Sequence, residues 1–76
     1  MKIRVQSFAE LRSYTDHLLG GELEVDARST VSDVLEQLGV PSQEPKIVLV
    51  NGRYAEPDRV LQADDLVVFF PPLEGG

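Results

Sequence analysis

The residue best suited to covalent chemistry is Gly76, because it carries the α-carboxylate of the chain. It ends the stretch FFPPLEGG, residues 69–76, in which two aromatic residues and two prolines precede Gly75 and Gly76. Glycine has no Cβ atom, so such an end is thin enough to enter a narrow channel and can adopt positive φ. A free carboxylate is a poor electrophile and must be activated, usually as an acyl phosphate or acyl adenylate, before it accepts sulfur or an amine. We therefore expect the C-terminus to be a substrate.

The rest of the sequence offers no second reactive centre. It has no GxxxxGK[ST] motif and no Gly-rich turn between a strand and a helix, so we expect the adenylating site to belong to another protein. It has no Cys, which excludes disulfides, thiolate metal sites and a Cys nucleophile. His17 stands alone and is interpreted as a surface residue. Asp64 and Asp65 supply too few oxygen donors for a metal site and are interpreted as a solvated turn. We expect this chain to bind no metal and no cofactor.

The composition limits the classes of partner. Seven basic and thirteen acidic residues give a net charge of -6, which argues against nucleic acid and favours a partner with a basic surface. The first residues, MKIRVQSF, lack the apolar run of a secretory signal. The longest apolar run, residues 66–70, is far below the roughly 20 residues that span a bilayer. We expect a single small cytoplasmic domain that does not bind membranes.

The strands that must position the tail can be read from side-chain alternation and apolar runs. Five segments have this character: residues 2–8, 22–27, 47–50, 53–55 and 66–70. In the first, Ile3 and Val5 face inward while Phe8 falls on the polar face. The dipeptide Asn51-Gly52 predicts a hairpin between the third and fourth segments. The last segment is apolar on both faces, as expected of a central strand.

Two segments have helical character. Residues 31–38 carry apolar side chains at i, i+3, i+4 and i+7, which form one stripe for packing on a sheet. Thr30 and Asp33 form a near-capping-box arrangement at the start, and Gly39 suits the end of this helix. Residues 9–19 have a looser helical spacing, which the Gly20-Gly21 turn ends.

This order of elements predicts an α+β fold. A mixed sheet of four or five strands that grasps one main helix is a β-grasp, ubiquitin-like fold, with the last strand central and parallel to the first. We assign residues 1–70 to this domain and residues 71–76 to an extended C-terminal tail. Pro71 and Pro72 cannot donate to a strand ladder, so pairing stops there and the chain turns away from the body. The six residues after Phe70 would reach about 20 Å at full extension.

The sequence resembles the MoaD/ThiS family of ubiquitin-like sulfur carriers nearly from end to end. The matching pieces are VQSFAELR (residues 5–12), Thr30-Val31, Val-Asn-Gly (residues 50–52) and above all FFPPLEGG. The FFPP-x-x-GG pattern is similar to the ending of the small subunit of molybdopterin synthase. Two features depart from that branch: residues 39–46 are short for a molybdopterin carrier, and Asp64 stands where the family commonly has Gly.

The resemblance implies a sulfur carrier rather than an enzyme. An E1-like adenylating enzyme of the MoeB/ThiF type would use ATP to adenylate Gly76, and a sulfurtransferase or cysteine desulfurase would supply the sulfur of a thiocarboxylate. The tail would then enter the large subunit of molybdopterin synthase, which holds the catalytic side chains. The residues recognised in the tail would be Pro71, Pro72, Leu73, Glu74 and Gly75.

Three aromatic residues match positions where the family exposes apolar side chains on the sheet face opposite the helix. We predict that Phe8, Tyr54 and Phe70 form a docking patch for these partners, since exposed aromatic clusters tend to mark interfaces. The alternative is that Tyr54 and Phe70 are ordinary core residues.

Three functions remain open from the sequence alone. The sulfur carrier is the first, with molybdopterin (molybdenum or tungsten cofactor) biosynthesis as the expected pathway and thiamine-thiazole synthesis as the alternative. A ubiquitin-like modifier joined to lysines through Gly76 would use the same activated carboxylate. A β-grasp binding module with an inert tail is the third.

Overall fold

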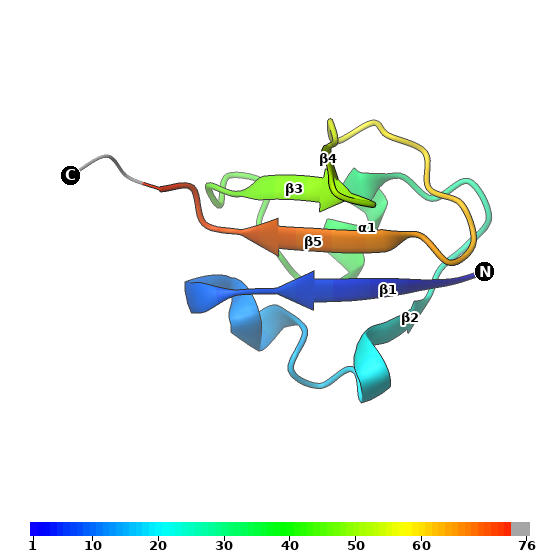
Figure 1. Ribbon diagram of the computed structural model, residues 1–76, viewed down its shortest axis with the longest axis horizontal. Coiled ribbons are helices and arrows are strands. Elements are labelled where there is room, and N and C mark those ends of the chain that lie inside the picture. Colours follow the sequence, from blue (N-terminus) through cyan, green and yellow to red (C-terminus); the bar gives the residue numbers. More distant parts are fainter. Residues whose placement is uncertain (74–76) are drawn as a thin grey trace.

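The structure, a computed structural model that describes residues 1–73, contains one five-stranded mixed sheet with a single α-helix on one of its faces (Figure 1). The strands are β1 (Lys2–Ser7), β2 (Glu22–Glu24), β3 (Ile47–Val50), β4 (Arg53–Tyr54) and β5 (Leu66–Phe70), in the spatial order β2-β1-β5-β3-β4. β5 is central, parallel to β1 and antiparallel to β3. The β-grasp fold predicted from the sequence is confirmed.

The core lies between the sheet and the helix α1 (Val31–Gln37), which is behind the sheet in Figure 1. Its largest fully buried side chains come from β1, α1, β3, β5 and the loop before β5: Ile3, Val5, Val31, Val34, Val50, Leu61, Val67 and Phe69. Alternate residues of β1 are exposed, as the sequence predicted. The helix therefore covers one face of the sheet and leaves the other uncovered by any element within residues 1–73.

Both ends of α1 are closed by local hydrogen bonds. The Thr30 side chain accepts from the Asp33 backbone N–H at 3.1 Å, and the Asp33 carboxylate accepts from the Thr30 N–H at 2.9 Å, which completes a capping box. At the other end Gly39 has φ +83°, and the Val40 N–H donates to the Leu35 carbonyl oxygen at 2.9 Å. This is the Schellman geometry that ends helices. The boundaries predicted for this helix are correct to within one residue.

The predicted helix at residues 9–19 is wrong in type and length. The structure has a 3₁₀ helix η1 (Ala9–Tyr14), turns, and a second short 3₁₀ segment η2 (Leu19–Gly21). Hydrogen bonds spaced by three residues hold the region, such as Leu18 N–H to the Thr15 carbonyl oxygen at 3.0 Å. Only Leu11 of this stretch is buried, and Leu19 is 89% exposed. A regular α-helix over residues 9–19 would not be stabilised by packing, because so little of this stretch is buried against the rest of the domain.

The second strand is shorter than predicted. The sequence alternates through residues 22–27, but β2 ends at Glu24 because its partner β1 begins at Lys2, the residue opposite Glu24. One more ladder-like bond follows, from the Val25 N–H to the Met1 carbonyl oxygen at 2.8 Å. Val25 is buried as expected, whereas Ala27 is exposed.

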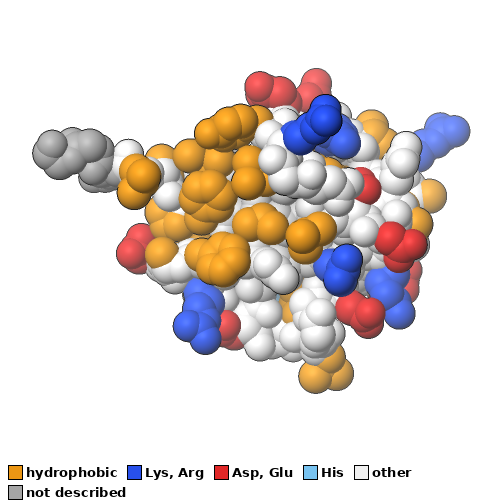
Figure 2. All heavy atoms as spheres, viewed as in Figure 1, with side chains coloured by type: hydrophobic (Ala, Val, Ile, Leu, Met, Phe, Trp, Pro, Cys, Tyr) orange, Lys and Arg blue, Asp and Glu red, His pale blue; other side chains and the backbone are white. Residues whose placement is uncertain are grey.

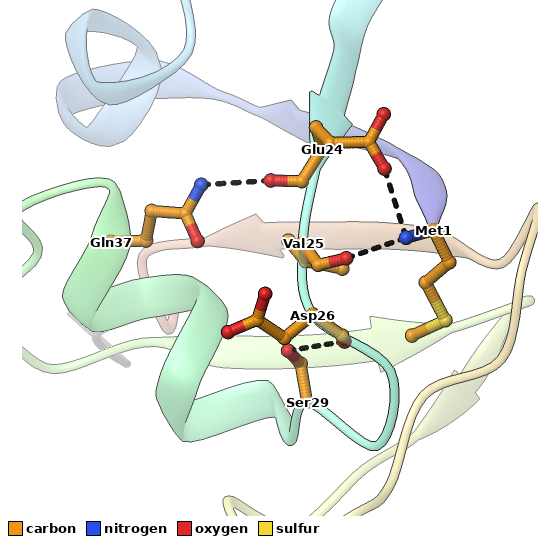
Figure 3. Close-up of polar contacts among 6 residues, drawn as sticks. All are labelled: Met1, Glu24, Val25, Asp26, Ser29 and Gln37. Carbon is orange, nitrogen blue, oxygen red and sulfur yellow. Dashed lines mark hydrogen bonds and ion pairs between the residues drawn. The ribbon is translucent and has the colours of Figure 1, made fainter.

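Polar contacts join the start of the chain to the end of β2, and join β2 to α1 (Figure 3). The Met1 ammonium donates to the Val25 carbonyl oxygen at 2.7 Å and lies 2.9 Å from the Glu24 carboxylate. The Gln37 side chain donates to the Glu24 carbonyl oxygen at 3.0 Å, which links α1 to the same strand. The hydrogen bond and charge of the ammonium lower the pKa of Glu24.

None of the helices within residues 1–73 has the length and apolar character of a membrane span.

Candidate functional site: the tail root and the outer sheet face

The tail leaves the body at Leu73 rather than at Phe70. Pro71 and Pro72 are half-buried and border a hollow whose other walls are Glu10, Leu11, Glu44 and Pro45. Leu73 is 98% exposed. The first two residues after β5 therefore still contact the body, and Leu73 is the first fully exposed residue of the tail. Glu74, Gly75 and Gly76, which the sequence singled out, lie outside the described residues.

The central strand β5 fixes the position of Pro71 and Pro72, which we call the tail root. Phe69, next to last in β5, is fully buried, and β5 is paired along both edges by β1 and β3. Pro71 follows β5 directly, and a residue without an N–H cannot extend the ladder. The point at which the tail leaves the sheet is thus positioned by strand pairing on both sides.

The start of β5 is held by the Val-Asn-Gly turn. Asn51 has φ +52° and Gly52 has φ +85°, the positive values of the hairpin turn that the sequence predicted. The Asn51 amide donates to Asp65 Oδ1 at 2.9 Å, while Asn51 Oδ1 accepts from the Leu66 N–H at 2.9 Å. Asp65 Oδ2 also accepts from the Gln62 N–H at 2.8 Å. The solvated turn expected for Asp65 is wrong, since its side chain is buried and fully used in this network.

An apolar surface covers much of the sheet face opposite α1. Val67 and Phe69 of β5, and Val48 and Val50 of β3, point toward the helix and are buried, so the alternate residues point the other way. We call this surface the outer patch and define it by six residues: Phe8, Ile47, Leu49, Tyr54, Val68 and Phe70. Figure 2 shows hydrophobic side chains gathered on the half of this face nearer the tail, with most charged side chains around the margin.

Strand register brings the outer patch together. Leu49 lies opposite Val68 on one side and Tyr54 on the other, and Ile47 lies opposite Phe70. Phe8 extends β1 beside β5 through a hydrogen bond from its N–H to the Phe69 carbonyl oxygen at 3.2 Å.

The structure therefore places all three aromatic residues named from the sequence on this face. Tyr54 is 79% exposed and Phe8 50%, so neither is a core residue, and Phe70 is half-buried. Sequence reasoning missed Ile47, Leu49 and Val68, although the apolar character of both faces of their strands was the available signal.

The backbone next to Phe8 is held in an unusual conformation. Ala9 has φ +55°, a left-handed value that costs a residue with a Cβ atom about 1–2 kcal/mol. The Leu11 N–H donates to the Phe8 carbonyl oxygen at 3.1 Å and closes the first turn of η1. This sharp turn follows β1, which ends at Ser7, and places Phe8 at the start of η1, at the margin of the outer patch.

The described residues supply little further chemistry. His17 is exposed, as interpreted from the sequence. Within residues 1–73, no group of three or more His, Cys, Asp or Glu side chains is placed to hold a metal ion. The features of the site are thus a positioned tail root and an apolar surface beside it.

Comparison with known proteins agrees with this geometry. The model of the ThiS family matches residues 5–76. The crystal structure of SAMP1 from Haloferax volcanii has 26% identity and a TM-score of 0.76 over 100% of both chains. A crystal structure of small archaeal modifier protein 1 from H. volcanii has 24% identity and a TM-score of 0.74 over 95% of this chain and 98% of that one, and supports the fold alone.

A third similar structure is that of a protein named for molybdopterin conversion. It is from Pyrococcus furiosus, is provisionally named molybdopterin converting factor, subunit 1, and has 27% identity and a TM-score of 0.75 over 96% of this chain and 99% of that one. None of the curated proteins compared with the chain gives a significant match. The resemblance drawn from the tail and the Val-Asn-Gly turn is confirmed, and the chain belongs to the ThiS family of ubiquitin-like β-grasp proteins.

Proposed function

We propose that this chain is a sulfur carrier whose chemistry takes place at the Gly76 carboxylate. The observation that carries the proposal is the exit of the chain from the sheet: β5 is paired on both edges, Pro71 and Pro72 rest against the body, and Leu73 is 98% exposed. A chain end presented in this way suits insertion into the active site of another protein.

The chemistry assigned to the tail requires partners. A carboxylate oxygen of Gly76 attacks the α-phosphorus of ATP in an E1-like enzyme, and pyrophosphate leaves. The terminal sulfur of a persulfide on a sulfurtransferase or cysteine desulfurase then attacks the acyl carbon, and AMP leaves. A thiol attacks the donor's sulfur in the resulting acyl disulfide, so that the terminus is released as a thiocarboxylate and the thiol and the donor cysteine become a disulfide. The carrier supplies the acyl group and the partners supply the catalytic side chains.

Molybdopterin biosynthesis is the pathway we favour. The FFPP-x-x-GG ending and the likeness to the P. furiosus protein named for molybdopterin conversion both support it. In this pathway the tail enters the large subunit of molybdopterin synthase, where the sulfur passes to a cyclic pterin precursor. Thiazole synthesis would use the same tail chemistry with a different acceptor.

The outer patch is proposed as the docking surface for these partners. It presents exposed aromatic side chains beside the tail root, and buried aromatic anchors often dominate the energetics of interfaces. A partner that covers the patch would hold the tail root in a defined position relative to its own active site.

A ubiquitin-like modifier is the second candidate, favoured by the full-length likeness to SAMP1. Mass spectrometry of the native chain separates the two functions. A carrier gives an intact chain that ends at Gly76 with one oxygen replaced by sulfur after incubation with its activating enzyme, ATP and a sulfur source. A modifier gives isopeptide-linked chains on lysines of other proteins. A chain that shows neither product, and no exchange of labelled pyrophosphate into ATP, would contradict both.

A further inference from the structure

A continuous groove runs along α1 on the helix side of the sheet. One hollow of about 480 Å³ lies between α1 and the loop at residues 39–46, and a second of about 420 Å³ lies between that loop, β3 and residues 55–57. Both hollows are lined by Leu35, Ser42, Lys46 and Pro57, so they adjoin. We call this feature the helix groove.

The floor of the helix groove is apolar and one wall is a sheet edge. Val31, Leu35, Val40 and Val48 line it and are buried parts of the core. β4 pairs with β3 only at Leu49 and Val50, with one further bond from the Ala55 N–H to the Val48 carbonyl oxygen at 3.0 Å. Before that bond the start of β3 has no strand partner on this side within residues 1–73, and sheet edges can pair with extended segments of other proteins.

The rim of the helix groove is acidic. Glu36, Glu44 and Glu56 line it, and none of them forms an ion pair within residues 1–73. Among the described residues that line the groove, the one cation is Lys46, whose ammonium donates to the Glu44 carbonyl oxygen at 2.7 Å and to those of Pro41 and Ser42 at 3.4 Å. Lys46 thus closes its own loop, while the carboxylates face the groove.

The helix groove also approaches the tail. The hollow at the tail root shares Glu44 and Pro45 with it and continues to Pro71 and Pro72, where Glu10 adds a further carboxylate. The path of apolar floor and acidic rim therefore extends from α1 to the point where the chain leaves the sheet.

We propose that the helix groove binds an extended apolar segment of a partner protein that is flanked by lysine or arginine residues. The apolar centre of the segment would cover the floor beside the edge of β3, and its basic ends would meet the carboxylates of the rim. Charge of this sign would speed association and exclude acidic segments. Because the groove and the outer patch lie on opposite sides of the sheet, one partner can occupy the groove while another covers the patch.

The test is a titration of the ¹⁵N-labelled full chain with a capped peptide, Lys-Val-Val-Val-Lys, at low ionic strength. The expected result is a set of amide shift changes centred on Leu35, Val48 and Ala55, with little change at Phe8 or Tyr54. The matched peptide Glu-Val-Val-Val-Glu should bind at least about tenfold more weakly, because its ends repel the rim. The assay measures binding alone, so its outcome is independent of any activation of Gly76.

A variant that lacks two carboxylates of the rim provides the second part of the test. The double substitution Glu36→Gln and Glu56→Gln changes only exposed side chains and should weaken binding of the basic peptide about tenfold. Glu22→Gln, on β2 and outside the groove, is the matched control and should leave it unchanged. Shift changes on the outer patch instead, equal binding of the two peptides, an unaffected double variant or no binding at millimolar peptide would overturn the proposal.

Discussion

The Asn51 side chain joins two strands that are separated in sequence. Its amide donates to Asp65 Oδ1 at 2.9 Å, and its oxygen accepts from the N–H of Leu66, the first residue of β5, at 2.9 Å. The Asn51 backbone N–H also donates to the Leu66 carbonyl oxygen at 2.8 Å. The β3–β4 turn is therefore fastened to the start of the strand that carries the tail.

Removing this side chain should destabilise the whole domain. Asn51→Gly keeps the positive φ available but removes the donor to Asp65 Oδ1 and the side-chain acceptor of the Leu66 N–H, which costs about 1–3 kcal/mol in the free energy of unfolding. Asn51→Ala should cost more, because a Cβ atom at positive φ adds strain of about 1–2 kcal/mol. Urea unfolding of the two variants separates the terms. Native stability of Asn51→Gly would show that the hydrogen bonds contribute nothing.

Shortening Phe8 should weaken docking without unfolding the chain. Half of its surface is already exposed, so Phe8→Ala removes little core packing. If the outer patch is the docking surface, affinity for the activating enzyme should fall at least about tenfold, or ~1.4 kcal/mol. Isothermal titration calorimetry with the enzyme measures the change.

Leu19→Ala is the matched control for Phe8. Leu19 is also an exposed apolar residue, at 89%, but it lies in η2 outside the outer patch. Its truncation should leave the affinity unchanged. Equal losses from Leu19→Ala and Phe8→Ala, or undiminished binding by Phe8→Ala, would contradict a docking role for the patch.

Deleting Gly76 should abolish activation and leave the thermal midpoint of unfolding unchanged. The buried hydrophobic core of the described chain ends at Phe69, and the acyl group that would be adenylated belongs to Gly76. Calorimetry gives the midpoint, and exchange of labelled pyrophosphate into ATP gives activation. A large loss of stability would mean that the terminus is a structural element.

Acid should weaken the contact between Glu24 and the Met1 ammonium. The folded-state pKa of Glu24 lies below its ordinary value, through the hydrogen bond and charge of that ammonium. A carboxyl group with a depressed folded pKa contributes stability above its unfolded pKa, and the contribution disappears as the pH falls through the folded value. Glu24→Gln removes the contribution at neutral pH. The stability gap between the parent and Glu24→Gln should therefore narrow on acidification.

Salt provides the check on this pH dependence. The Glu24 side chain is 73% exposed, so screening should reduce the gap at neutral pH. A gap that persists unchanged below the folded pKa would show that Glu24 acts through packing rather than charge.

Elements defined by contacts close in sequence were predicted well. The caps of α1 at Thr30 and Gly39 depend on neighbouring residues, and so does the Asn51-Gly52 turn. In β1 exposed and buried side chains alternate, because successive side chains of a strand point to opposite faces of the sheet. In β5 both faces are apolar, and this too could be read from the sequence. Asp64 supports the same view, since its φ of +69° is a left-handed conformation that Asp can adopt in a turn.

The sequence by itself determined the β-grasp class and the family resemblance, because strand periodicity, helix caps and the FFPPLEGG ending are written in short stretches of chain. Only the tertiary structure decided that β2 stops at Glu24, that the outer faces of β3 and β5 join Phe8 and Tyr54 in one patch, and that the tail leaves the body at Leu73. Each of these depends on which distant residues meet across the sheet, and strand register and burial are set by those long-range contacts rather than by local propensity.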